Sequence, residues 1–388
     1  MIDNFLQQYY QIVRQSELFK SYYQDHDDYQ NAPLMGKKEL ISQLNDHFDL
    51  HRESSGVYLV RSGGSTQKPL VFPVDIAENL EQRAVLSAAL KKAGVFTPKT
   101  IALNMFGYME MYRTAAIMDD LLERCSATTL VASASLPYED AYHMAQNFKP
   151  NLLLGTPSKL FLFALYLKKN QLSLSIENLL FGGEFLPTSH VDVFEKIFGT
   201  RQIYSLYGSA ETGIWAWCDY SRSPSLFRVI DGLVVEVHMP DADGYGSLLV
   251  SNLFRKRFPI FRYNTGDIGR WIEIDGISYL ELKGRESHSF MFNECNYELD
   301  DFNLILADVE RFQIQIMPHE GHTILKFLLI TDLSDIVKAQ YIELKLKQLY
   351  EIFGYEVKNL AVLAGADLQL YTNQTTGKTP VIVDNRLR

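Results

Sequence analysis

From residue 57 onward, short apolar runs that are typical of strands alternate with longer runs that have the apolar spacing of helices. The strand-like runs include VYLVR at 57–61, TIALNMF at 100–106 and ATTLVAS at 127–133, and helical spacing covers 76–93 and 109–124. Strands and helices that alternate at these lengths form βαβ units, in which helices cover a largely parallel sheet. The pattern therefore predicts an α/β fold.

The pattern changes after about residue 228, where short strand-like runs are separated by the turns Asp243-Gly244 and Asp275-Gly276. Such turns favour antiparallel hairpins or a barrel-like arrangement. Mixed helical and strand-like segments then return. We therefore expect a large N-terminal α/β domain at 1–283, with a mostly parallel sheet and a short antiparallel β region. A small C-terminal α+β domain follows at 284–388.

Composition and charge exclude several classes of protein. The 388 residues carry a formal net charge of −10, and the densest basic cluster is Arg255-Lys256-Arg257, so we expect no nucleic-acid partner. The longest apolar runs fall far short of the ~20 residues that a membrane span needs. The N-terminal segment does not resemble a secretory signal, and the three cysteines lie far apart. We expect a cytoplasmic protein with no membrane partner.

A loop rich in glycine and hydroxyl residues follows the strand at 57–61. Its backbone N–H and side-chain O–H groups are suited to wrapping a phosphate chain, and its lysine adds positive charge. Pro69 and an extended run follow the lysine, so the loop does not lead into a helix as a Walker loop does. The candidate phosphate-binding residues are Ser62, Gly63, Gly64, Ser65, Thr66 and Lys68.

Two later segments combine a strand, a tight turn and a carboxylate. In YSLYGSAETG at 204–213, Tyr207 is placed to stack on a base and Glu211 to bind magnesium, which prefers carboxylate and phosphate oxygens. In FRYNTGD at 261–267, Asp267 follows a strand and a tight turn, where it can accept hydrogen bonds from a ribose diol. Taken alone, 204–213 is better explained as a glycine-containing turn with a solvated glutamate, and the alternative for 261–267 is an aspartate that caps a turn.

The order of the motifs is more informative than any one of them. In order they are Ser-Gly-Gly-Ser-Thr, Gly-Gly-Glu, Tyr-Gly-Ser-Ala-Glu-Thr-Gly, Tyr-Asn-Thr-Gly-Asp, Gly-Arg and Thr-Gly-Lys. This series resembles the adenylate-forming superfamily, which includes acyl-CoA synthetases and the adenylation domains of peptide synthetases. Within it, the most similar branch is that of phenylacetate–CoA ligase and coenzyme F390 synthetase, on the segments NMFGYMEMYRTA, KPNLLLGTPSKL and FGGEFLPTSH. The resemblance covers about 57–388.

The resemblance implies an enzyme that uses ATP and Mg²⁺ to activate a small carboxylic acid as an acyl-AMP. A mobile C-terminal domain would close over the site. Fixed cations would stabilise the charge that gathers at phosphorus in the transition state, and no side-chain nucleophile is required. The implied catalytic residues are Lys378, Glu211 and Arg285, with Glu211 as the metal ligand. The implied nucleotide-binding residues beyond the phosphate loop are Gly182, Gly183, Glu184, Tyr207, Gly208, Ser209 and Asp267.

The acid and the acceptor are less well defined. Phe106, Gly107, Tyr108 and Trp215 are candidate walls of the acid pocket, although aromatic residues near strands are commonly core. The resemblance implies transfer to a thiol, either CoA or a carrier-protein phosphopantetheine. However, Glu294 stands where CoA-using relatives commonly have glycine, and residues 286–301 contain no Lys or Arg. Transfer to a protein or an amine, and a degenerate nucleotide-binding relative without activity, remain alternatives.

Overall fold

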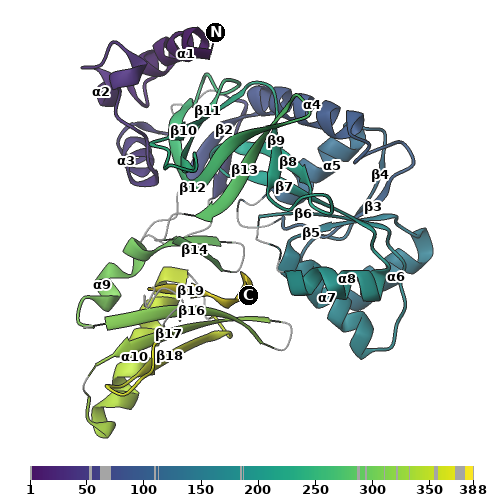
Figure 1. Ribbon diagram of the computed structural model, residues 1–388, viewed down its shortest axis with the longest axis vertical. Coiled ribbons are helices and arrows are strands. Elements are labelled where there is room, and N and C mark those ends of the chain that lie inside the picture. The colour runs from purple at the N-terminus through teal and green to yellow at the C-terminus, as the bar shows by residue number, and fades with distance from the viewer. Residues whose placement is uncertain are drawn as a thin grey trace.

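The computed structural model is built around one large twisted sheet with helices on both faces (Figure 1). The sheet has eleven strands in the order β10-β11-β12-β13-β9-β8-β7-β6-β5-β3-β4. The described residues are 2–51, 55–61, 71–108, 111, 113–183, 186, 188–285, 289–292, 295–309, 311–319, 322–331, 333–353, 357–371 and 381–387.

One half of this sheet is parallel and is built from βαβ units. Its strands are β3 (Ile101–Asn104), β4 (Thr128–Val131), β5 (Leu152–Gly155), β6 (Asn178–Gly182) and β7 (Gln202–Ser209). The helices α4 (Ile76–Lys92) and α5 (Thr114–Arg124) pack on one face. The other face is covered by α6 (Tyr138–Phe148), α7 (Pro157–Lys169) and α8 (Thr188–Phe198). This confirms the predicted α/β class.

The other half of the sheet is antiparallel and larger than the short region that the sequence predicts. It consists of β8 (Gly213–Asp219), β9 (Leu226–Val229), β10 (Leu233–His238), β11 (Gly246–Asn252), β12 (Ile260–Ile274) and β13 (Ile277–Arg285). Because β7 pairs with both β6 and β8, the two halves form one continuous sheet. The antiparallel strands extend the parallel sheet and are not a separate barrel.

Two local predictions are wrong in their details. The helix expected at 109–124 begins at Thr114, with Arg113 as its N-cap residue. Asp267 does not follow a strand and a turn, because it lies inside β12, which runs for 15 residues. The glycine that suggested the turn, Gly266, has a φ of 73°, and the register between β11 and β12 shifts nearby. The strand absorbs this irregularity and continues, since it stays paired with β13.

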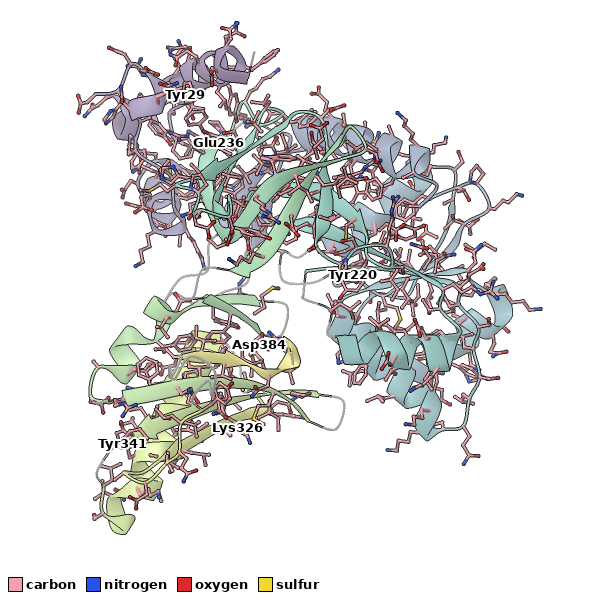
Figure 2. The ribbon with its side chains drawn as sticks, viewed as in Figure 1. Tyr29, Tyr220, Glu236, Lys326, Tyr341 and Asp384 are labelled. Carbon is pink, nitrogen blue, oxygen red and sulfur yellow. The ribbon has the colours of Figure 1, made fainter. Side chains whose placement is uncertain are left out.

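The N-terminal segment packs on the antiparallel half. It comprises α1 (Ile2–Gln15), α2 (Lys20–Tyr23), η1 (Tyr29–Asn31) and α3 (Lys37–His47), and it shares a core with β12 and with the hairpin of β1 (Val57–Arg61) and β2 (Val71–Asp75). The backbone N–H of Asn264 donates to the carbonyl of Met35 at 2.8 Å. The Arg262 guanidinium donates to the Glu236 carboxylate at 3.1 Å and to the backbone carbonyl of Tyr29 at 3.2 Å. Figure 2 shows Tyr29 and Glu236 near each other. The segment is thus tied to β12 through both backbone and side chains.

The C-terminal part has a sheet and a core of its own. Its strand order is β18-β17-β16-β19, formed by Leu360–Ala364, His322–Ile330, Arg311–His319 and Ile382–Asp384. The helix α10 (Asp335–Phe353), predicted at 334–353, packs in this core with the hairpin of β14 (Ser289–Phe292) and β15 (Cys295–Glu298). The short elements η2 (Leu299–Phe302), α9 (Asn303–Leu306) and η3 (Asn385–Leu387) complete it. Among the described helices, none has the length and apolar character needed to cross a membrane.

Candidate active site

The turn between β7 and β8 carries the carboxylate of Glu211 at the point where the parallel and antiparallel halves of the sheet meet. The Ser209 and Thr212 hydroxyls lie 2.8 Å apart across this turn. The backbone is so tightly packed here that a Cβ atom at Gly208 would lie 2.2 Å from the Gly213 carbonyl oxygen. Gly213 itself has a φ of 71°. The two glycines therefore permit a tight turn that places Glu211 at the carboxyl end of β7.

A buried polar network holds this turn from behind. The side-chain amide of Gln82 on α4 donates to the carbonyls of Thr212 (3.2 Å) and Ile214 (3.0 Å). Asn252, at the end of β11, donates to Gln82 Oε1 and to the Thr212 carbonyl, both at 2.9 Å. The network joins a helix and two strands that are distant in sequence, and it orients the backbone that precedes β8. No motif in the sequence points to Gln82 or Asn252.

Glu211 has one carboxylate oxygen satisfied and one free. Tyr263 donates its hydroxyl proton to Glu211 Oε1 at 2.6 Å, and both side chains are buried. The other oxygen, Oε2, is buried and has no hydrogen-bond partner among the described residues. Buried carboxylate oxygens are normally paired or bound to a cation. Within the described part of the chain, no group of three or more His, Cys, Asp or Glu could hold a metal ion. A single buried carboxylate with a free oxygen fits Mg²⁺, which takes its remaining ligands from phosphates and water.

Asp267 and Arg285 lie opposite each other on neighbouring strands. They are register partners in the antiparallel pair of β12 and β13, and the Asp267 side chain is buried. Tyr263, the partner of Glu211, is four residues before Asp267 on the same strand. The structure thus brings Asp267 and the backbone of Arg285 together, and β12 links them to Glu211 through Tyr263.

The predicted adenine-binding residues that the structure describes lie at the carboxyl ends of two adjacent parallel strands. The strand β6 ends at Gly182, where a Cβ atom would lie 3.2 Å from the Leu206 carbonyl oxygen of β7, and Gly183 has a φ of 81°. The Tyr207 ring, half-buried, packs edge-on against Trp215 and Phe227, with both centroid distances at 5.3 Å. Gly208 and Ser209 continue β7 beyond this ring. These positions lie at the carboxyl ends of parallel strands, where ligands bind in open α/β sheets.

The four candidate acid-pocket residues have different environments. Phe106 and Trp215 are buried in the core between the sheet and the α4–α5 face, whereas the Tyr108 side chain is 59% exposed. The carbonyl of Gly107 accepts from the backbone N–H of Ala115 at 3.1 Å. The structure therefore places Phe106 and Trp215 in core packing and does not gather the four around one cavity.

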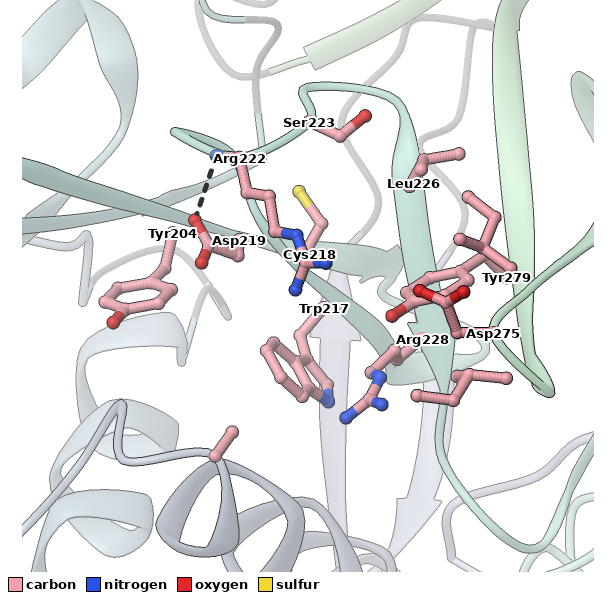
Figure 3. Close-up of a pocket in the computed structure, with 13 residues that line it drawn as sticks. Tyr204, Trp217, Cys218, Asp219, Arg222, Ser223, Leu226, Arg228, Asp275 and Tyr279 are labelled. Carbon is pink, nitrogen blue, oxygen red and sulfur yellow. Dashed lines mark hydrogen bonds between the residues drawn. The ribbon is translucent and has the colours of Figure 1, made fainter.

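A separate cavity of about 290 Å³ lies beside the antiparallel half of the sheet (Figure 3). The Arg228 guanidinium lies near the rings of Trp217 (5.7 Å) and Tyr279 (5.6 Å), and Tyr204 and Cys218 also line the cavity. None of the predicted site residues that the structure describes lines it. Because Tyr204 precedes Tyr207 on β7, the cavity lies nearer the start of that strand than Glu211 does.

Several predicted site residues lie outside the described residues. They are Ser62, Gly63, Gly64, Ser65, Thr66, Lys68, Glu184 and Lys378, together with Glu294, which bears on the acceptor.

Comparisons with known proteins were made for the whole chain, and no family model matches it. Indoleacetate–lysine synthetase of Pseudomonas savastanoi is 23% identical over 284 residues, which are 72% of this chain and 69% of that protein. A structure of 2-hydroxyisobutyryl-CoA ligase in complex with 2-HIB-AMP and CoA is similar with a TM-score of 0.72 and 16% identity, over 99% of this chain and 89% of that one. The amide bond synthetase McbA from Marinactinospora thermotolerans is similar with a TM-score of 0.54 and 15% identity, over 84% and 69%.

Proposed function

We propose that this chain, which has the fold of the adenylate-forming superfamily, uses ATP and Mg²⁺ to activate a carboxylic acid as an acyl-AMP. The similarity in fold to an acid–CoA ligase and the 23% identity to indoleacetate–lysine synthetase support this proposal. The observation that carries the proposal is the free, buried oxygen of Glu211. It lies at the carboxyl end of the parallel strands, where the order of the motifs leads us to expect the triphosphate. We also propose that the protein acts in the cytoplasm, where ATP is available.

The proposed reaction needs charge stabilisation rather than a nucleophilic side chain. A carboxylate oxygen of the acid attacks the α-phosphorus of ATP. The bond between the α-phosphorus and the oxygen that bridges the α- and β-phosphates breaks, and pyrophosphate leaves with that oxygen. Bound magnesium would neutralise phosphate charge beside Glu211. We propose that Lys378 contacts the reacting carboxylate and the α-phosphate, with Arg285 near the ribose. Cations in these places stabilise the transition state more than the ground state.

We assign nucleotide binding to the predicted set of glycine, aromatic and carboxylate residues. Asp267 would accept hydrogen bonds from the ribose hydroxyls, and Tyr207 would line the adenine pocket with Gly182 and Gly183. The burial of Asp267 and the end of β6 at Gly182 support this assignment. Phosphate binding is assigned to the loop at 62–68.

We also propose two domains, 1–283 for nucleotide and acid binding and 284–388 as a lid. Their separate hydrophobic cores support the division. The described C-terminal core contains residues from Phe290 to Ala364, whereas three other cores contain residues between Leu6 and Leu280. A segment with its own sheet and core is the usual unit of a domain.

For the acceptor we propose a thiol, on CoA or on a carrier protein. The similarity in fold to 2-hydroxyisobutyryl-CoA ligase supports this choice. An amine is the second candidate, because one relative is an indoleacetate–lysine synthetase and McbA is an amide bond synthetase. The lack of Lys and Arg at 286–301 makes free CoA the least favoured of the thiols, since its phosphates need cations.

Exchange of labelled pyrophosphate into ATP tests the adenylation step. We expect exchange that requires both Mg²⁺ and one or more acids from a panel of aryl, fatty and amino acids. ATP binding without exchange for any acid would contradict the proposal and favour a nucleotide-binding protein without this activity. Once an acid is known, product formation with CoA, a phosphopantetheinylated carrier and free lysine, at equal concentrations, separates the acceptors.

A further inference from the structure

Three arginines gather around Tyr58, at the base of the β1–β2 hairpin. Arg83 on α4 donates to the Tyr58 hydroxyl at 3.3 Å. The guanidinium of Arg113, at the start of α5, lies 4.4 Å from the centre of the Tyr58 ring. Arg255, which follows β11, lies 5.3 Å from the ring of Phe72 on the partner strand β2 and interacts electrostatically with Tyr58 and Glu211.

These arginines differ in whether they have a partner. Arg83 forms an ion pair with Asp120 at 3.5 Å. Arg255 is 3% exposed, and its Nε and Nη1 atoms have no hydrogen-bond partner among the described residues. The same holds for Arg113 Nε and for Glu211 Oε2. The charge of Glu211 acts on Arg255 and raises its pKa, which opposes the larger effect of burial.

A buried guanidinium whose N–H groups lack hydrogen-bond acceptors is costly, because these groups lose water and gain no hydrogen bond in return. Burial accordingly lowers the pKa of Arg255, although the group remains a cation near neutral pH. Such a group is stable when an anion is bound beside it. The free donors of Arg255 and Arg113 and the free acceptor of Glu211 together suit an anion that arrives with a metal ion.

We infer that Arg255 and Arg113 bind the terminal phosphates of ATP, and hence pyrophosphate, beside Glu211. The inference rests on the proposed function and adds residues to which the motifs assign no role. A phosphoanhydride fits better than the acid substrate, because a triphosphate keeps negative charge after one Mg²⁺ binds, whereas the acid carries a single charge. Guanidinium groups also match phosphate geometry with paired N–H donors.

Binding measured by calorimetry on the full chain tests the inference, with pyrophosphate, ATP and AMP as probes in the presence of Mg²⁺. We expect Arg255→Lys and Arg113→Lys each to weaken pyrophosphate and ATP binding by about tenfold or more, the usual effect of losing a paired charged hydrogen bond. AMP lacks the terminal phosphates, so its affinity should change by less than about twofold. Arg257→Lys is the matched control, since it lies in the same loop and its guanidinium already pairs with Asp75 at 3.0 Å.

Two results would overturn the inference. One is an equal loss for AMP and ATP, which would mean that the arginines only support the fold. The other is unchanged pyrophosphate binding in both variants. If one variant does not fold, the other decides. If the wild-type protein binds none of the three probes, the proposed function fails as well. If the wild-type protein shows acid-dependent exchange but both variants bind pyrophosphate and ATP normally, only this inference fails.

Discussion

The hydroxyl of Tyr263 donates a 2.6 Å hydrogen bond to Glu211 and leaves the second oxygen of that carboxylate free. The two residues are 52 positions apart and come from β12 and from the turn that follows β7. The hydrogen bond selects one orientation of the carboxylate, in which Oε2 is available to a cation. Tyr263 is therefore expected to act on metal binding through Glu211.

Replacing Tyr263 by Phe should raise the Mg²⁺ concentration needed for half-maximal exchange by about tenfold. A hydrogen bond to a charged group stabilises a structure by about 1.5–3 kcal/mol. Part of this free energy holds the Glu211 carboxylate in the orientation that binds the metal, and it would be lost in the variant. Pyrophosphate exchange against Mg²⁺ concentration is the measurement. Tyr245→Phe is a matched control, since Tyr245 donates to Glu281 at 2.9 Å. An unchanged Mg²⁺ requirement in Tyr263→Phe would remove Tyr263 from this role.

Lys378→Ala should reduce adenylation by about 10² or more, the usual effect of losing one preorganised charge at a transition state. Its thermal unfolding should match that of the wild type. Asp267→Asn should instead weaken ATP binding first, because ribose contacts are made in the ground and transition states alike. The comparison needs kcat and KM for ATP in both variants. Near-normal exchange in Lys378→Ala would exclude the lysine from the mechanism.

Asn252→Ala should lower the free energy of unfolding by about 2–3 kcal/mol, because buried acceptors that lose their donor cost about 1–3 kcal/mol. The acceptors affected are Gln82 Oε1 and the Thr212 carbonyl. Urea denaturation measures the change. Asn170→Ala is the control, because Asn170 makes a similar side-chain bond to the Tyr166 carbonyl at an exposed position. Equal effects of the two substitutions would mean that the network contributes little.

Stability should fall with acid between about pH 6.5 and pH 4 because of His190. This ring stacks on Phe161, with centroids 3.7 Å apart, and burial, together with the charge of Arg386, lowers its pKa from 6.5 to about 4. In this pH range the unfolded chain binds a proton that the folded chain does not, so stability is present above pH 6.5 and is lost as the pH falls. The loss is on the order of 3 kcal/mol, at about 1.4 kcal/mol for each pKa unit.

The variant His190→Phe keeps an aromatic ring in the stack and removes the titrating group. Its unfolding free energy should therefore depend less steeply on pH than that of the wild type over this range. His143→Phe, at a position 64% exposed, should keep the wild-type slope. Parallel pH profiles for His190→Phe and the wild type would show that another group is responsible.

Local periodicity predicted much of the fold, since β1 at 57–61 and α4 at 76–92 match the expected segments closely. The extent of the antiparallel half was not predictable in this way. The apolar run of β8 would look the same in sequence whether the strand joined a new sheet or paired with β7. Contacts between strands decide which of the two forms. The long strand β12 was divided at Gly266 because a glycine with positive φ within a strand resembles a turn in sequence.

The candidate site was predictable where glycine-rich turns carry the signal, as at Glu211. Its supporting residues were not. Gln82 and Asn252 are 170 positions apart, and each is a single polar residue in an element that is otherwise ordinary. Arg255 appeared in the sequence as part of a short basic cluster, but the structure buries it. Burial and partners are tertiary properties, so neither could be inferred from local pattern.

The β-bridge between Met35 and Tyr263 has a consequence for N-terminal truncation of this protein. The recognisable motifs begin only after residue 57, so the sequence alone suggests that residues 2–47 are dispensable. They nevertheless support the strand that positions both Tyr263 and Asp267. Cleavage by a protease in this segment should leave every motif intact and still loosen the proposed nucleotide site. Limited digestion followed by an ATP-binding assay should then detect a loss of ATP binding while all of the proposed site residues are still present.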